Sequence, residues 1–176
     1  EDIKKYRKLH LWWDVTLGEA FNHVARIYPQ KIVVVDDTCK ITYAEMAELV
    51  NRLALVFIEL GLKPGDVILI QVSNVLEFCA IYQALQKIGV IPVMGVPRHA
   101  EKEMEHFGQI TNAVGWIGPA SYRKIDYLPM LQNLRKRLSS LKHIIILDAA
   151  GQSEKPGFES YQKILAQVKT GKHASS

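Results

Sequence analysis

The chain has 176 residues, of which 48% are hydrophobic and 23% are charged. This composition is typical of a globular domain and argues against a disordered or fibrous protein. The formal net charge of +4 is weak evidence for a polyanionic partner, because the lysines and arginines are spread along the chain. Apolar runs stay well short of the roughly 18 residues that a membrane span requires. We therefore expect a single cytoplasmic α/β unit with no membrane partner.

Hydrophobic periodicity divides the chain into alternating helices and strands. Helices are predicted at residues 16–27, 42–60, 74–89, 101–110 and 128–138. Strands are predicted at residues 32–35, in a second short segment ending at 41, and at 67–72, 90–94, 114–117 and 143–147. Strands separated by such helices are joined by right-handed crossovers. The sequence therefore predicts a three-layer α/β fold, with a mostly parallel sheet and helices on both faces.

Local signals support several of these elements. Thr42 with Glu45, and Asn74 with Glu77, have the spacing of capping boxes at helix starts. In the apolar run 67–72 only Gln71 is polar, as expected for a strand covered on both faces. Residues 36–38 are expected to form the turn of a small hairpin.

Both ends of the chain suggest a piece of a longer protein. Residue 1 is Glu rather than an initiating Met, and residues 171–176 are small and polar. We expect an α/β subdomain over residues 1–170 and a disordered tail over residues 171–176. Trp12 and Trp13 are expected to pack the first segment onto this subdomain, although docking to a partner is the alternative.

The sequence lacks the usual signatures of a complete active site. GxGxxG, GxxxxGK[ST], HExxH, GxSxG and CxxC are all absent, so we assign no catalytic residue. Cys39 and Cys79 lack the paired spacing of zinc ligands and are expected to be structural thiols. The histidines are scattered, so we expect no metal site.

Arg98 and His99 are the candidate residues for a substrate cleft. They follow the strand 90–94, and ligands in open α/β sheets bind beyond the carboxyl ends of the strands. Both side chains could face an anion there. The alternative is that they cap the following helix or lie at its solvated start.

Several segments resemble the adenylate-forming superfamily. Its first core motif, an [LI]TYxEL-like segment, is similar to ITYAEM at residues 41–46, and its second, LKxGxxxxP-like, is similar to LQKIGVIPV at residues 85–93. PVMGVPRH at residues 92–99 resembles the PVxALPxHR segment of 2,3-dihydroxybenzoate-AMP ligases, with Arg98 at a position where these ligases usually carry a small residue and Ala100 where they carry Arg. Further likeness lies at residues 13, 16–17, 28–29, 121–122, 126–127 and 141–145.

The resemblance implies the amino-terminal part of a ligase that uses ATP and Mg²⁺. Such an enzyme activates an aryl carboxylic acid as its adenylate and passes the acyl group to a carrier-protein or CoA thiol, as in siderophore biosynthesis. The family's phosphate loop, acid pocket, ribose-binding Asp and catalytic Lys would all lie beyond residue 176. We therefore expect this part alone to be inactive and not to bind ATP or Mg²⁺ tightly.

Three further expectations remain. Without the other domains of the ligase, exposed apolar surface would favour a homodimer. A stand-alone Rossmann-like module for ligand binding or interaction, without catalysis, is the alternative function. A nucleic-acid partner is not expected, because Lys4–Lys8 and Arg135–Arg137 are typical of solvated helix faces, although a nucleic-acid binder using Arg135–Arg137 is a third possibility.

Overall fold

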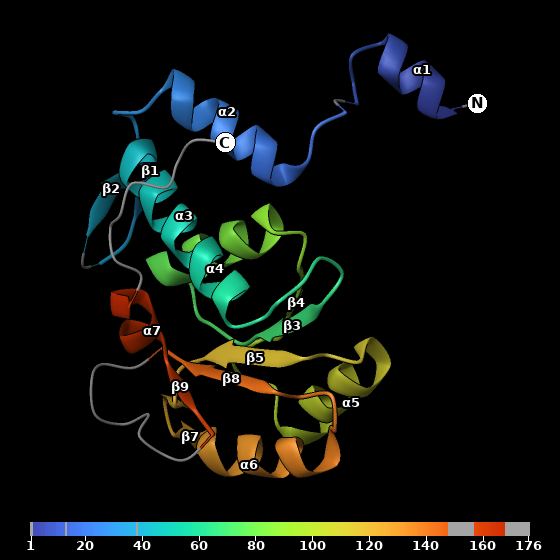
Figure 1. The fold of residues 1–176 in the computed structure, drawn as a ribbon, viewed down its shortest axis with the longest axis vertical. Coiled ribbons are helices and arrows are strands. Elements are labelled where there is room, and N and C mark those ends of the chain that lie inside the picture. The colour runs from blue at the N-terminus through green and yellow to red at the C-terminus, as the bar shows by residue number, and fades with distance from the viewer. Residues whose placement is uncertain (1, 13, 38, 148–156, 168–176) are drawn as a thin grey trace.

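A five-stranded parallel sheet forms the middle layer of the molecule (Figure 1). The computed structural model describes residues 2–12, 14–37, 39–147 and 157–167. The order of the strands is β4-β3-β5-β8-β9, and each neighbouring pair is parallel. The strands are β3 (Val67–Ile70), β4 (Ile91–Met94), β5 (Gly115–Gly118), β8 (His143–Ile146) and β9 (Glu159–Ser160). The predicted mostly parallel sheet is confirmed.

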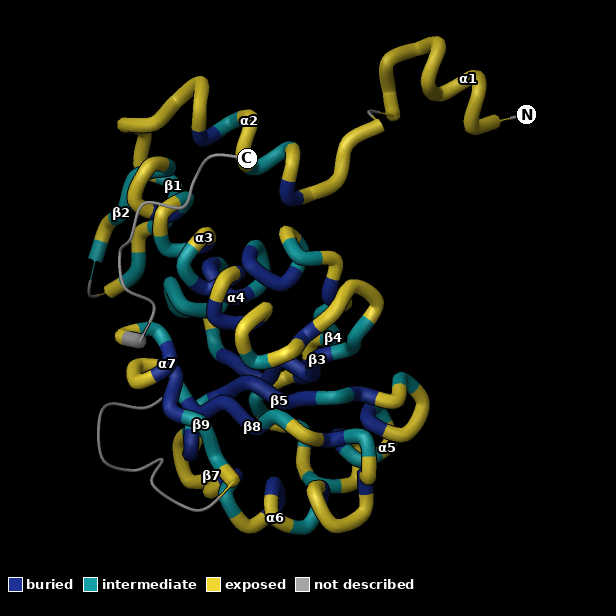
Figure 2. The backbone as a smooth tube through the Cα atoms, viewed as in Figure 1, coloured by how far each residue is buried: buried dark blue, intermediate teal, exposed yellow. Residues whose placement is uncertain are grey.

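Helices cover both faces of this sheet, which confirms the predicted three layers. One face carries α3 (Tyr43–Glu59), α4 (Leu76–Lys87) and α7 (Tyr161–Gln167), and the other carries α5 (Glu101–Thr111) and α6 (Leu128–Arg137). Successive side chains of a strand point to opposite faces. Ile68 and Ile70 therefore lie in the core with α3 and α4, whereas Leu69 lies in the core with α5 and α6. Figure 2 shows the buried residues concentrated on the central strands.

The remaining elements are peripheral. Helix α2 (Leu17–Ile27) packs outside α3 and α4. Two antiparallel hairpins are formed by β1 (Ile32–Val35) with β2 (Lys40–Thr42), and by β6 (Ser121–Tyr122) with β7 (Ile125–Asp126). The helix α1 (Asp2–Lys8) agrees with the solvated helix face expected at Lys4–Lys8, whereas the hairpin β6–β7, the strand β9 and the helix α7 were not predicted. Each is short, so its periodicity gives little signal.

Lys87, which lies in the second core motif, joins three helices. Its Nζ lies at the end of α4 and donates to Asn22 Oδ1 of α2 at 3.2 Å and to Asn51 Oδ1 of α3 at 2.5 Å. Burial lowers the pKa of Lys87 from its usual value. The motif therefore has a structural role in this chain, since it fixes the outer helix α2 on the helical layer.

The first segment does not pack onto the subdomain, so that prediction is wrong for Trp12. The Trp12 side chain is 50% exposed, and no residue of α1 is buried. Figure 1 shows α1 extending away from the layers. The apolar side chains of α1 therefore do not pack against the described core. Trp13, the turn residue Thr38 and the predicted tail 171–176 lie outside the described residues, and the boundary at residue 170 stays a prediction.

One of the two predicted capping boxes is confirmed. Thr42 N donates to Glu45 Oε2 at 2.7 Å, and Glu45 N donates to Thr42 Oγ1 at 3.3 Å. The second prediction is wrong, because α4 begins at Leu76 and its N-cap makes no side-chain hydrogen bond. Leu76 N donates instead to Asp36 Oδ2 at 3.2 Å. A carboxylate from the β1–β2 hairpin thus takes the place of the local cap, and its charge also favours the helix amino terminus.

Within the described residues, none of the helices combines the length and the apolar character needed to cross a membrane.

Candidate functional site

The order of the strands places a topological switch point beside β3. The chain leaves β3 for β4 through α4 on one face, and it returns from β4 to β5 through α5 on the other face. Ligands in open α/β sheets bind beyond the carboxyl ends of the strands at such a point. The connection from β4 to α5, residues 95–100, crosses the end of β3 there. It contains both predicted site residues, and we refer to it as the 95–100 loop.

Gln71 lies at the centre of this region and is fully buried. Its Nε2 donates to Val96 O at 3.2 Å and to His99 O at 2.9 Å, while its Oε1 accepts a hydrogen bond from Trp116 Nε1 at 3.2 Å. Buried polar side chains are costly unless they are hydrogen-bonded. The sequence signal was present, since Gln71 is the one polar residue of its run, but no role was assigned to it.

Tyr127 holds the same loop from a third element. It lies just before α6, is fully buried, and its hydroxyl donates to Pro97 O. Its ring meets the Trp116 ring edge-on, with the ring centroids 5.9 Å apart. Burial raises the pKa of Tyr127 to about 12. The phenol therefore stays protonated near neutral pH and remains a donor to the loop.

The structure places Arg98 and His99 side by side on this loop, in different environments. His99 is half-buried, its Nδ1 accepts a hydrogen bond from Val96 N at 3.1 Å, and its ring packs edge-on against Phe107. Arg98 is exposed and makes no hydrogen bond or ion pair with any residue in the described part of the chain. Arg98 is therefore the residue of the pair that offers a charge to a ligand.

Neither predicted residue supplies the side-chain cap of the following helix. Ala100 N donates to Glu103 Oε2 at 3.0 Å, so a residue of the first turn of α5 serves this purpose. Hydrogen bonds from the backbone N–H groups of Glu103 itself and of Ala100 lower the pKa of the Glu103 carboxyl.

Two glycines, Gly95 and Gly118, make room for close packing near the carboxyl ends of β3 and β5. A Cβ at Gly95 would lie 2.9 Å from Met104 Sδ, and a Cβ at Gly118 would lie 2.7 Å from Gln71 O and 2.5 Å from Trp116 Cη2. A side chain at Gly118 would clash with backbone and with the indole ring, and one at Gly95 would displace Met104. The end of β3 is therefore filled by protein atoms on the face that carries α5 and α6.

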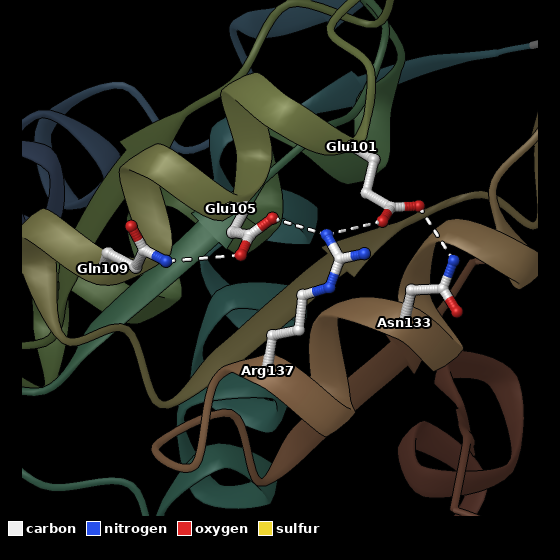
Figure 3. A network of polar contacts seen from close by, with 5 residues as sticks. All are labelled: Glu101, Glu105, Gln109, Asn133 and Arg137. Atoms are coloured by element: carbon white, nitrogen blue, oxygen red, sulfur yellow. Dashed lines mark hydrogen bonds and ion pairs between the residues drawn. The ribbon is translucent and has the colours of Figure 1, made fainter.

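A polar network fixes the helix that follows the loop (Figure 3). Arg137 Nη1 of α6 lies 3.0 Å from Glu101 Oε1 and 2.8 Å from Glu105 Oε2, both on α5. Asn133 Nδ2 donates to Glu101 Oε2 at 3.0 Å, and Gln109 Nε2 donates to Glu105 Oε1 at 3.3 Å. The carboxylates, Glu105 first, raise the pKa of Arg137. Its charge is already matched within the chain, which weakens the nucleic-acid possibility that rested on residues 135–137.

Among the described residues, no group of three or more His, Cys, Asp or Glu side chains is placed to hold a metal ion. Arg98 and His99 remain the candidate site residues, and the absence of a complete active site remains a prediction.

Known proteins resemble this chain in sequence and in fold. Residues 21–173 match the family described as AMP-binding enzyme. The 2,3-dihydroxybenzoate-AMP ligase of Bacillus subtilis is 30% identical over 88% of this chain and 28% of its own length. The salicyl-AMP ligase / salicyl-S-ArCP synthetase of Mycobacterium tuberculosis is 31% identical over 96% of this chain and 30% of its own length. The vibriobactin-specific 2,3-dihydroxybenzoate-AMP ligase of Vibrio cholerae is 32% identical over 81% and 26%.

A solved structure shows the same fold as this chain. The apo structure of Mycobacterium smegmatis MbtA superposes with a TM-score of 0.83 at 26% identity, covering 98% of this chain and 31% of that one. The chain thus spans less than a third of the length of each of these four proteins. The resemblance found in the core motifs is confirmed, and the chain belongs to the family of AMP-binding enzymes, beside ligases that form aryl adenylates.

Proposed function

We propose that this chain is the amino-terminal part of a longer ligase that activates an aryl carboxylic acid as its adenylate. The observation that carries the proposal is the family match over residues 21–173, together with relatives named for 2,3-dihydroxybenzoate and salicylate. The vibriobactin-specific relative favours a role in siderophore biosynthesis. We place the enzyme in the cytoplasm, where ATP is available.

The proposed reaction has two steps. The carboxylate of the acid attacks the α-phosphate of ATP, so that a new acyl–phosphate bond forms as the bond to pyrophosphate breaks. The thiol of a carrier protein or of CoA then attacks the acyl carbon, and AMP leaves. The name of the salicyl-S-ArCP synthetase supports a carrier protein as acceptor.

The described residues do not fit a site for ATP and Mg²⁺. The sequence has no glycine-rich phosphate loop, and no described group of carboxylates is placed for a metal ion. Most contacts to the triphosphate, and the metal ligands, would therefore come from the remaining domains of the ligase, which are the chain's proposed partners. The contribution of this chain is scaffold and one wall of the substrate cleft, with Arg98 and His99 on the 95–100 loop facing that cleft.

The test is carboxylate-dependent exchange of labelled pyrophosphate into ATP, measured with the 176-residue chain and with the product of the complete gene. We expect exchange with a hydroxybenzoate for the complete product and none for the chain alone. Exchange by the isolated chain would overturn the division of labour, and no exchange by the complete product with any aryl or aliphatic acid would overturn the ligase function.

The alternative is a stand-alone Rossmann-like binding module without catalysis. The family match over residues 21–173, to relatives of which the chain covers less than a third, supports the ligase over this module. A reading frame that stops after Ser176, together with tight binding of an anion to the chain alone, would favour the module.

A further inference from the structure

Two buried side chains, Gln71 and Tyr127, donate hydrogen bonds to the 95–100 loop, and a third, Trp116, contacts both of them. Gln71 follows β3, Trp116 lies in β5, and Tyr127 precedes α6. We propose that they are positioning residues, which hold the loop so that Arg98 meets an anionic group of the substrate. This inference rests on the proposed ligase function, and the anionic group is either the carboxylate of the acid or a phosphate of ATP.

The indole of Trp116 determines how the Gln71 amide is oriented. An indole N–H can only donate, so the amide oxygen of Gln71 must face Trp116 Nε1, which lies 3.2 Å away. The amide nitrogen then faces the loop and donates to the carbonyls of Val96 and His99, at 3.2 and 2.9 Å. Gln71 thus binds both ends of the segment 96–99, and Trp116 fixes the orientation of the Gln71 amide.

Tyr127 holds the middle of the same segment, since its hydroxyl donates to the carbonyl of Pro97. The carbonyls of Val96, Pro97 and His99 are therefore each bound to a buried side chain. Arg98 is the residue of this segment whose carbonyl has no side-chain donor among the described residues, and its own side chain is exposed. The backbone is held on both sides of the residue that carries the charge.

A simple connection from β4 to α5 would not require this arrangement. Burying an amide, an indole N–H and a phenol costs desolvation that apolar side chains would avoid. A fully satisfied polar network instead selects one conformation of the segments it joins. Gly118 makes room for it, because a Cβ at this position would lie 2.5 Å from Trp116 Cη2 and 2.7 Å from Gln71 O.

The first arm of the test measures the loop itself, without reference to chemistry. Tyr127→Phe removes one hydroxyl, and Gln71→Met removes the amide at similar volume. We expect amide hydrogen exchange at Val96 and His99 to become about tenfold faster in each variant. Tyr161→Phe is the control, because it makes the same chemical change at a buried tyrosine in the core on the opposite face. Unchanged exchange at the loop in Tyr127→Phe would overturn the proposal even if Gln71→Met fails to fold.

The second arm measures the Michaelis constants of the complete ligase for the acid and for ATP. Arg98→Gln should raise the Michaelis constant of the substrate that Arg98 contacts, which identifies that substrate. Tyr127→Phe should raise the same Michaelis constant about tenfold. Tyr161→Phe should leave both Michaelis constants unchanged. If the loop loosens and neither constant rises, the substrate role is overturned. A wild-type ligase without activity would overturn the proposed function, and the exchange data would still decide whether Gln71 and Tyr127 hold the loop.

Discussion

At the scale of single residues, Asp36 links a hairpin to a helix that is distant in sequence. Its Oδ1 accepts a hydrogen bond from Cys39 N at 2.9 Å within the hairpin, and its Oδ2 accepts one from Leu76 N at 3.2 Å at the start of α4. Both carboxylate oxygens therefore satisfy backbone donors, one of which the helix cannot satisfy itself. Asp36 thus replaces the cap that Asn74 and Glu77 were expected to form.

We predict that Asp36→Ala lowers the free energy of unfolding by about 1–2 kcal/mol, the usual cost of losing a cap together with a turn hydrogen bond. Urea denaturation of the wild type and the variant measures the change. Asp37→Ala is the matched control, because this neighbouring aspartate is exposed. Equal destabilisation by both substitutions would show that the link between Asp36 and Leu76 adds nothing to stability.

At the scale of elements, α2, α3 and α5 each carry a glutamate in the first turn that accepts hydrogen bonds from the backbone. These glutamates are Glu19, Glu45 and Glu103, and the hydrogen bonds lower the pKa of each carboxyl below its usual value of 4.5. A carboxyl whose pKa is lower in the folded state stabilises that state above the pKa of the unfolded chain. This contribution is lost as the pH falls below about 4.5 and the carboxyl takes up a proton.

We predict that Glu45→Gln makes stability less dependent on pH below about pH 4.5, because the variant has no carboxyl to protonate at this helix start. Urea midpoints measured between neutral pH and about pH 3 give the slope for each protein. Glu48→Gln, at an exposed position of the same helix, should keep the wild-type slope. A variant at position 45 with the wild-type slope would contradict the role of this cap.

The elements also show which parts of the fold could be predicted from the sequence. The capping box of Thr42 and Glu45 joins residues three apart, and the apolar runs of β3, β5 and β8 are continuous, so both signals are local. The roles of Asp36 and Gln71 depend on segments 40 and 25 to 28 residues away. Periodicity carries no information about such partners. The loop with Arg98 and His99 was located by the rule for strand ends, whereas the side chains that hold it were not.

At the scale of the whole molecule, the sheet has an open edge at β4. This strand pairs with β3 alone among the described strands, and Ile91 and Met94 are 50% and 57% exposed. Val96, just beyond the strand, is 53% exposed. Unpaired edges with apolar side chains are templates for pairing with another segment. In the proposed ligase the remaining domains would cover this edge, and in the isolated chain a second copy would do so.

We therefore predict that the isolated chain self-associates through β4 as its concentration rises, and that Met94→Lys shifts the association to concentrations about tenfold higher. The charge would have to be buried in the paired edge, which is unfavourable without a partner. Sedimentation velocity over a wide concentration series measures the effect. Ile110→Lys is the control, because this residue is 70% exposed but belongs to α5 rather than to β4. If both substitutions weaken association equally, general surface hydrophobicity drives the association rather than the β4 edge. A strictly monomeric wild type would show that this edge is not a docking surface in the isolated chain.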